Sequence, residues 1–180
     1  MKLLIASDLH GSAYYGRALL DAFRRERADR LVLLGDLLYH GPRNDLPEEY
    51  DTKAVTALLN GMPDKLLCVR GNCDSEVDQM VLTFPILADY AFLFVDGLTI
   101  CATHGHLYGP DNPPPLSEGA LLLCGHTHLP VRRDCGTFTY LNPGSLSLPK
   151  SDTPHSYMTL ENGVFTWHDL LTGEMFHPLE

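Results

Sequence analysis

Side chains that commonly bind metal ions follow directly after short apolar runs of the chain. Seven of them stand in this position: Asp8, His10, Asp36, Asn72, His104, His126 and His128. Mixed oxygen and nitrogen ligands suit Mn, Fe, Zn or Co better than Mg or Ca, and the lack of thiolates among them argues against a structural zinc site. The residue types therefore predict a transition-metal centre assembled from separate segments.

The predicted elements bring these segments to one place. The apolar runs at residues 3–6, 31–34 and 65–69 are typical of buried strands, and helices are predicted between them at 14–27 and 52–59. This alternation predicts parallel strands with right-handed crossovers. Because the carboxyl ends of parallel strands line one edge of a sheet, the polar side chains that follow them should meet there.

Hairpins are predicted in the second half of the chain. Their strands surround short turns at Asp96-Gly97, Gly136 and Asn162-Gly163, and cover residues 90–95 and 98–102, 131–134 and 137–141, and 157–160 and 164–168. Another short strand, 121–124, precedes His126 and His128. We expect a second, largely antiparallel sheet within a single domain covering residues 1–180, with two stacked sheets and helices outside.

The composition narrows the range of partners. The chain has 180 residues and a formal net charge of -10, which argues against nonspecific binding to nucleic acid or to anionic membranes. No apolar stretch approaches the roughly 20 residues needed to cross a bilayer, and the N-terminus lacks the pattern of a signal peptide. The five cysteines form no C-x-x-C pair. We therefore expect a cytoplasmic protein with a small-molecule substrate.

Each ligand-type residue has a simpler interpretation when taken alone. Asp8 could cap the following turn, Asn72 could form a turn beside Gly71, and the histidines could be solvated loop residues. Together these interpretations require strand after strand to end in a ligand-type group by chance. The metal centre is the better interpretation of the whole set.

The order of five short motifs resembles that of the calcineurin-like metallophosphoesterases. The motifs are Asp8-Leu9-His10, Gly35-Asp36-Leu37-Leu38-Tyr39-His40-Gly41, Gly71-Asn72-Cys73-Asp74, Thr103-His104-Gly105-His106 and Gly125-His126-Thr127-His128. Residues 40–44, 69–80 and 142–145 further resemble the small bacterial YfcE-type phosphodiesterases. The resemblance implies an αββα sandwich of two mixed β-sheets flanked by helices, with the site above the sheet edges.

The resemblance also implies two divalent metal ions, with Mn²⁺ expected and Zn²⁺, Fe²⁺, Co²⁺ or Ni²⁺ as alternatives. It divides the ligands into Asp8, His10 and His128 for one ion, and Asn72, His104 and His126 for the other, with Asp36 bridging both. Two such ions lower the pKa of a bridging water and clamp a phosphate for in-line attack. We therefore expect a phosphodiesterase that hydrolyses small phosphate diesters with a bridging hydroxide, without a covalent enzyme intermediate.

Cys73 departs from the pattern of many relatives, in which a histidine at this position is thought to protonate the leaving oxygen. A thiol is a weaker hydrogen-bond donor than imidazolium, so we expect slow turnover of esters with poor leaving groups. Nucleophilic attack by Cys73 is a rival role, but no phosphate-cradling loop accompanies it. His106 could instead be the acid, could orient a ligand, or could be a solvated loop residue.

Three further residues are candidates for supporting roles. Asp74 could accept a hydrogen bond from a ligand imidazole, or could cap a helix that begins at Glu76. Arg43 and Asn44 follow the Asp36 segment and could bind the substrate's phosphate or alcohol group, although Arg43 could also simply be exposed.

Other functions remain open at this point. A phosphomonoesterase would use the same metal centre, and a protein-binding scaffold would keep the fold without catalysis. Scaffolds of this kind tend to lose ligand histidines, whereas His10, His104, His126 and His128 are all present here. The acidic chain disfavours a nuclease. A homo-oligomer is compatible with the sequence, but no segment specifies it.

Overall fold

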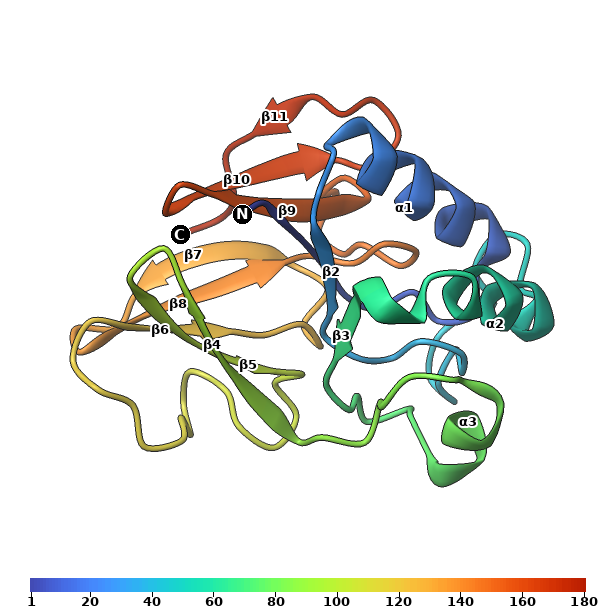
Figure 1. The fold of residues 1–180 in the computed structure, drawn as a ribbon, viewed down its shortest axis with the longest axis horizontal. Helices are drawn as coiled ribbons and strands as arrows, with labels where there is room; N and C mark the ends of the chain where they lie inside the picture. Colours follow the sequence, from blue (N-terminus) through green and yellow to red (C-terminus); the bar gives the residue numbers. More distant parts are fainter.

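The computed structural model describes residues 1–180 and contains two β-sheets packed face to face (Figure 1). The first sheet has the strand order β11-β10-β9-β1-β2-β3. Its strands are β1 (Leu3–Ala6), β2 (Arg30–Leu33), β3 (Leu66–Cys68), β9 (Ser156–Glu161), β10 (Val164–Asp169) and β11 (Met175–Phe176). β1, β2 and β3 are parallel, as the alternation of strands and helices predicts.

The second sheet has the strand order β4-β5-β6-β8-β7. Its strands are β4 (Tyr90–Val95), β5 (Leu98–Thr103), β6 (Ala120–Leu123), β7 (Pro130–Asp134) and β8 (Phe138–Pro143). The β4–β5 and β7–β8 pairs are antiparallel, but β5–β6 and β6–β8 are parallel. The expectation of a largely antiparallel second sheet was therefore wrong, and the implied fold of two mixed sheets with flanking helices is confirmed.

The third predicted hairpin, β9–β10, belongs to the first sheet, where β9 pairs with β1 in the antiparallel direction. β9 is apolar on both faces. Tyr157 packs into the core beneath the helices, whereas Met158 and Leu160 pack into the core between the sheets. Such a strand needs cover on both sides, and a central position in the first sheet provides it.

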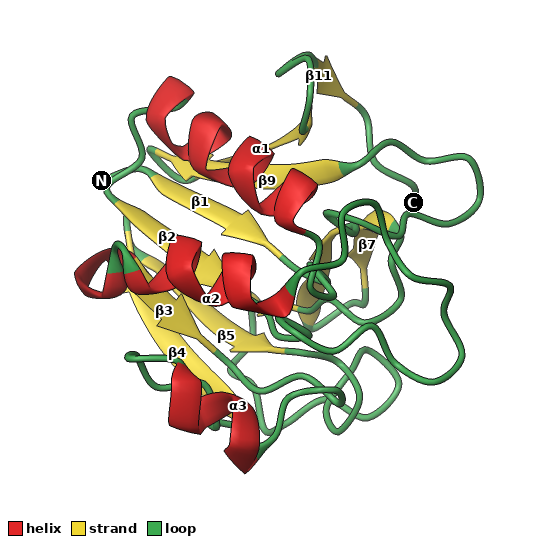
Figure 2. Cartoon of the chain, turned by 90° about the vertical axis from the view of Figure 1, so that its right-hand side faces the viewer, coloured by secondary structure: helices red, strands yellow, loops and turns green.

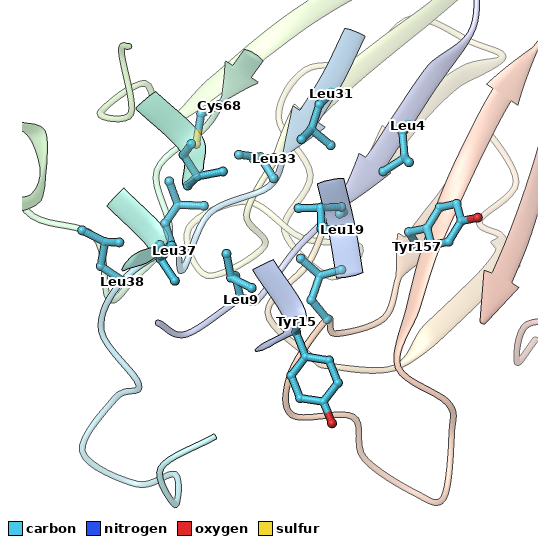
Figure 3. Close-up of a cluster of buried hydrophobic side chains, with 14 of the residues drawn as sticks. Leu4, Leu9, Tyr15, Leu19, Leu31, Leu33, Leu37, Leu38, Cys68 and Tyr157 are labelled. Atoms are coloured by element: carbon cyan, nitrogen blue, oxygen red, sulfur yellow. The ribbon is translucent and has the colours of Figure 1, made fainter. Parts of the chain in front are cut away.

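The three α-helices lie on the same side of the molecule, where α1 and α2 cover the first sheet and α3 lies past its edge strand β3 (Figure 2). They are α1 (Ala13–Arg25), α2 (Thr52–Asn60) and α3 (Glu76–Val81), and a short 3₁₀ turn, η1 (Pro63–Lys65), precedes β3. Leu19 of α1 packs against Leu4 and Leu31 of the sheet in the core cluster shown in Figure 3. None of the helices has the length and apolar character that crossing a membrane would require.

The outer face of the second sheet is covered by a loop. Residues 104–119, between β5 and β6, contain no helix, and Leu116 from this segment packs against Cys101 and Leu122 of the sheet. The Pro113-Pro114-Pro115 run in the same segment lacks backbone N–H donors, which is incompatible with a helix interior. The helix layer is therefore confined to the first sheet.

Candidate metal centre

The seven predicted ligands come together where five parallel strands end. Three of these strands, β1, β2 and β3, lie in the first sheet, and β5 and β6 lie in the second. The side chains form a continuous cluster in space: Asp8, His10, Asp36, Asn72, His104, His126 and His128. The two sheets thus contribute to the same rim.

One half of the cluster is built from Asp8, His10 and His128, all of which are buried. The Oδ1 atom of Asp8 lies 3.2 Å from Nε2 of His128 and 3.6 Å from Nε2 of His10. The two Nε2 atoms are themselves 3.3 Å apart. Three potential donor atoms therefore face one common point.

The other half is built around Asp36 and His104. Oδ2 of Asp36 lies 3.5 Å from Nε2 of His104 and 3.7 Å from Nε2 of His10, so this carboxylate stands between the two halves. Nε2 of His104 is also 3.1 Å from Oδ1 of Asn72 and 3.2 Å from Nδ1 of His126. Asn72 and His126 close the cluster on its solvent side, since Asn72 is exposed and His126 half-buried.

Backbone carbonyls fix the orientation of three imidazole rings. Nδ1 of His10 lies 2.9 Å from the carbonyl of Tyr39. Nδ1 of His104 lies 2.6 Å from Leu34 O, and Nδ1 of His128 lies 2.6 Å from Leu148 O. An Nδ1–H that donates to a carbonyl leaves Nε2 with a lone pair, which is the tautomer that binds a metal ion. His126 points Nδ1 into the cluster instead.

The backbone at the cluster adopts an uncommon conformation. Five of the candidate ligands have φ between 49° and 67°, in the left-handed region: Asp8, His10, Asp36, His126 and His128. Non-glycine residues persist there only when the surrounding structure holds them, and such positions concentrate at functional sites. Here the hydroxyls of Ser145 and Ser147 donate to the carbonyl of Asp8 at 2.9 and 3.1 Å and hold the backbone of this segment in place.

The donor atoms fit a divalent cation. Oδ1 of Asp8 is buried and accepts no hydrogen bond, and the Nε2 lone pairs of His10 and His128 face each other across the same space. Acceptors that converge without donors repel one another, and a cation removes that repulsion. Burial opposes the charge of Asp8, but when the imidazoles of His10 and His128 take up protons in the metal-free protein they become donors to Asp8 and hold its pKa well below its usual value. The aspartate therefore stays ionised, as a ligand must.

Comparison with known proteins agrees with this geometry. Residues 1–163 match the calcineurin-like phosphoesterase superfamily domain. The chain belongs to this superfamily. It is 48% identical over 166 residues to the phosphodiesterase YfcE of Escherichia coli K12, covering 92% of this chain and 90% of that protein. It is 29% identical over 175 residues to the probable metallophosphoesterase YsnB of Bacillus subtilis, covering 92% and 88%.

Solved structures give the same result. The structure of the Escherichia coli phosphoesterase YfcE superimposes with a TM-score of 0.95 at 45% identity, covering 99% of this chain and 98% of the other. Vps29 from Entamoeba histolytica shares the fold alone, with a TM-score of 0.64 at 22% identity, covering 98% and 96%. Membership of the calcineurin-like superfamily, together with the buried histidine and aspartate groups, implies that the centre holds divalent metal ions.

Within this calcineurin-like site, Asp74 binds backbone N–H groups, a role that neither interpretation of the sequence predicted. Its carboxylate accepts hydrogen bonds from the backbone N–H groups of Asp36, Leu37 and Gly71, at 2.8, 2.9 and 2.7 Å. It bonds to no imidazole, and Ser75 rather than Asp74 caps α3. The loops that carry Asp36 and Asn72 have N–H groups without carbonyl partners, and the Asp74 carboxylate joins the two loops through them.

Cys73 and His106 lie at the border of the cluster. The backbone N–H of Cys73 donates to Oδ1 of Asp36 at 2.8 Å, and burial followed by the charge of Asp36 raises the pKa of the Cys73 thiol to about 12. The ring centroid of His106 is 5.3 Å from that of His104, and its buried Nδ1 has no hydrogen-bond partner. Burial and the neighbouring His104 lower the pKa of His106. At neutral pH we therefore expect a thiol and a neutral imidazole.

A polar cavity of about 350 Å³ opens onto the ligands of the superfamily site. Arg43 and Asn44 line it, as expected of substrate-binding residues, although Asn44 also donates to the carbonyl of His40 at 2.7 Å. Lys150 lines the same cavity and was missed from the sequence. It stands in no recognisable motif; its place is fixed by a backbone hydrogen bond of 3.3 Å to the carbonyl of His128.

Proposed function

We propose that the protein is a metal-dependent phosphodiesterase that hydrolyses small phosphate diesters. The observation that carries the proposal is the convergence of carboxylate, imidazole and amide donors at one rim, with Oδ1 of Asp8 buried and lacking a hydrogen-bond donor. The 48% identity with the phosphodiesterase YfcE over 92% of the chain supports the same reaction class.

We further propose that the centre holds two Mn²⁺ ions. Asp8, His10 and His128 would hold one ion and Asn72, His104 and His126 the other. Asp36 would bridge them, and its Oδ2 atom, 3.7 Å from His10 and 3.5 Å from His104, lies between the two groups. When bound, such ions supply an activated water and neutralise the charge of the phosphate.

The chain's own groups would bind and orient the ester. Arg43 and Lys150 face the polar cavity beside the ligands and would place positive charge next to the phosphate oxygens. Cys73 lies on the wall of the same cavity, and its thiol keeps its proton at neutral pH because burial and Asp36 raise its pKa to about 12. It would offer the leaving oxygen a weak hydrogen bond rather than a strong acid. His106 is the second candidate for that role.

The proposed substrate is a small molecule rather than a nucleic acid. The chain has a formal net charge of -10. The only cations that line the polar cavity are Arg43 and Lys150, which is too few to follow a polynucleotide backbone. All five cysteines are free thiols, which supports our proposal of a reducing, cytoplasmic location.

Hydrolysis of bis-p-nitrophenyl phosphate by metal-stripped protein, before and after addition of Mn²⁺, tests the proposal. We expect activity that depends on Mn²⁺, that Asp36→Asn abolishes, and that exceeds the activity on p-nitrophenyl phosphate. Asp111→Asn is the control, because Asp111 is exposed, is not a candidate ligand and does not line the polar cavity. A faster monoester would establish a phosphomonoesterase. No turnover with Mn²⁺, Co²⁺, Ni²⁺ or Zn²⁺ would favour a protein-binding scaffold.

We also propose that two copies pair through β4, the edge strand of the second sheet. β4 and β5 are joined by a two-residue turn, which makes Val95 and Leu98 a hydrogen-bonded pair. In β4 the residues that form hydrogen bonds with β5 are therefore Val95, Leu93 and Ala91. The N–H and C=O groups of Tyr90, Phe92 and Phe94 therefore point away from β5. Natural proteins often place a charged residue or a proline on an edge strand to prevent pairing with another strand. β4 contains neither.

The same three aromatic side chains are 48%, 42% and 75% exposed. Antiparallel pairing centred on Phe92 would put each Tyr90 opposite Phe94 of the partner subunit and bring the rings of the two strands into contact. Size-exclusion chromatography with light scattering would measure the mass. We expect at least a dimer that Phe94→Lys converts to a monomer, while Val164→Lys, at a 63% exposed position on β10, leaves the dimer unchanged. A monomeric parent protein would contradict the proposal.

A further inference from the structure

A second cavity, apolar in character, lies beside the metal centre. It has a volume of about 650 Å³, and six of its eleven lining residues are hydrophobic. The walls come from the segment after β2, from the start of α2, and from α3 with the residues just before it. They include Tyr39, Tyr50, Val77 and Val81. This volume falls in the range of about 300–1,000 Å³ that is typical of small-molecule sites.

The apolar cavity and the polar cavity share a wall. Cys73 lines both of them. Its Sγ atom lies within 4.8 Å of a ring nitrogen of His10 and of a carboxylate oxygen of Asp36. Tyr39 also connects the metal centre with the apolar cavity. Its carbonyl accepts a hydrogen bond from Nδ1 of His10 at 2.9 Å, and Tyr39 itself lines the apolar cavity. A group attached to a phosphate at the metal centre therefore needs to pass only Cys73 to reach the apolar space.

The two cavities differ sharply in chemistry. Only one of the eleven residues that line the polar cavity is hydrophobic, and Arg43 and Lys150 give it positive charge. Around the apolar cavity, by contrast, Val77 is 69% and Val81 49% exposed although both are hydrophobic. Exposed hydrophobic side chains that gather around a hollow mark a binding site. The anionic and the apolar parts of one ligand would each find a matching environment.

We propose that the apolar cavity binds one ester group of the substrate, so that the protein prefers phosphodiesters in which one alcohol is large and apolar or aromatic. The proposal rests on the phosphodiesterase function, since the phosphate must lie at the metal centre. The charged oxygens then face Arg43 and Lys150, and the apolar ester group crosses Cys73 into the space between Tyr39 and Val77. The cavity volume leaves room for more than a single ring.

Binding of non-hydrolysable phosphonates separates this proposal from catalysis. Methyl-, phenyl- and 1-naphthylphosphonate carry the same anionic group and differ only in the apolar group. We expect the dissociation constant, measured by calorimetry with Mn²⁺-loaded protein, to fall about 10- to 50-fold from methyl to phenyl, as burial of one ring predicts. A further fall is expected for naphthyl. Equal affinity for all three, within a factor of about three, would overturn the proposal.

A charge in the apolar cavity provides the second arm of the test. Val77→Asp places a carboxylate on the wall, at the N-terminal turn of α3, where an acidic residue does not oppose the helix. We expect Val77→Asp to weaken the binding of 1-naphthylphosphonate about tenfold or more, and the binding of methylphosphonate less than about twofold. Val164→Asp is the matched control, since Val164 is 63% exposed on β10 and lines neither cavity.

The outcomes distinguish failure of the apolar subsite from failure of the proposed phosphodiesterase function. If Val77→Asp and Val164→Asp change naphthylphosphonate binding equally, the apolar subsite is excluded while hydrolysis of bis-p-nitrophenyl phosphate stays as evidence of the reaction. If Mn²⁺ restores no hydrolysis of that diester in the parent protein, the proposed function itself fails. Selective loss of naphthylphosphonate binding in Val77→Asp, with Val77→Leu retaining it, would support the subsite.

Discussion

Replacement of Asp74 by asparagine tests whether this side chain holds the metal centre together. In the native protein its carboxylate accepts from three backbone N–H groups, those of Asp36, Leu37 and Gly71. Asparagine has the same shape, but only one of its two terminal atoms accepts hydrogen bonds. With the amide oxygen facing Asp36 and Gly71, the amide NH₂ would face the N–H of Leu37, and one buried donor would lose its partner.

The size of the effect follows from two opposing contributions. A buried donor without a partner costs about 1–3 kcal/mol, and the two remaining hydrogen bonds weaken because their acceptor is no longer charged. On the other side, burial raises the pKa of Asp74, so removal of the charge recovers part of its desolvation cost. We expect a net loss of about 2–3 kcal/mol in the free energy of unfolding. For a chain of this size that corresponds to a Tm roughly 4–12 °C lower.

Thermal unfolding of the metal-free Asp74→Asn protein measures the loss of stability directly, and calorimetric titration with Mn²⁺ measures the loss of affinity. Because Asp74 positions the Asp36 loop, we expect Mn²⁺ affinity to fall about 10- to 100-fold, as for other residues that orient metal ligands. Asp111→Asn, at an exposed position, controls for the change of charge. A Tm within about 2 °C of the parent together with unchanged Mn²⁺ affinity would refute the structural role assigned to Asp74.

Three further substitutions have defined outcomes. Gly125→Ala would push a methyl group against the side chains of Ser7 and Asp8, so Mn²⁺ affinity measured by calorimetry should fall about 10- to 100-fold. Cys73→His should raise kcat for alkyl esters more than for nitrophenyl esters, and equal changes would exclude an acid role at this position. Burial lowers the pKa of His168. As pH falls below about 6.5, His168 is therefore protonated in the unfolded chain before it is protonated in the folded protein, and the free energy of unfolding decreases. Urea titrations at pH 7 and pH 5 should show a smaller decrease in His168→Gln.

The clustering of the seven candidate ligands could be predicted because its signal is local. Asp8, Asp36 and Asn72 each follow a buried apolar run, and parallel pairing brings strand ends to one edge whatever the details of the loops. The groups that orient the ligands carry no such signal. The partners of His104 and His128 are the carbonyls of Leu34 and Leu148, and every residue has a carbonyl. Only the folded backbone decides which one is in reach.

Long-range contacts also explain the features that the sequence misplaced or missed. The sequence of β9 shows an apolar strand, but its membership of the first sheet depends on contacts with β1, more than 150 positions earlier in the chain. Asp74 has the residue type expected of a helix cap, yet its partners are N–H groups that point toward it only because the Asp36 loop turns through a φ of 55°. Lys150 joins the cavity through a hydrogen bond between backbones. Long-range geometry, rather than residue type, determines all three.

The apolar cavity and the chemistry of Cys73 point to the same kind of substrate. A thiol whose pKa is raised to about 12 is a poor acid at neutral pH, and the lowered pKa of His106 leaves that imidazole neutral. Neither group strongly protonates a departing alkoxide, so esters of weakly acidic alcohols should react slowly. Phenols are far more acidic and leave without full protonation. An aromatic alcohol would therefore compensate for the missing histidine, and its ring is also what the space between Tyr39 and Val77 would bind best.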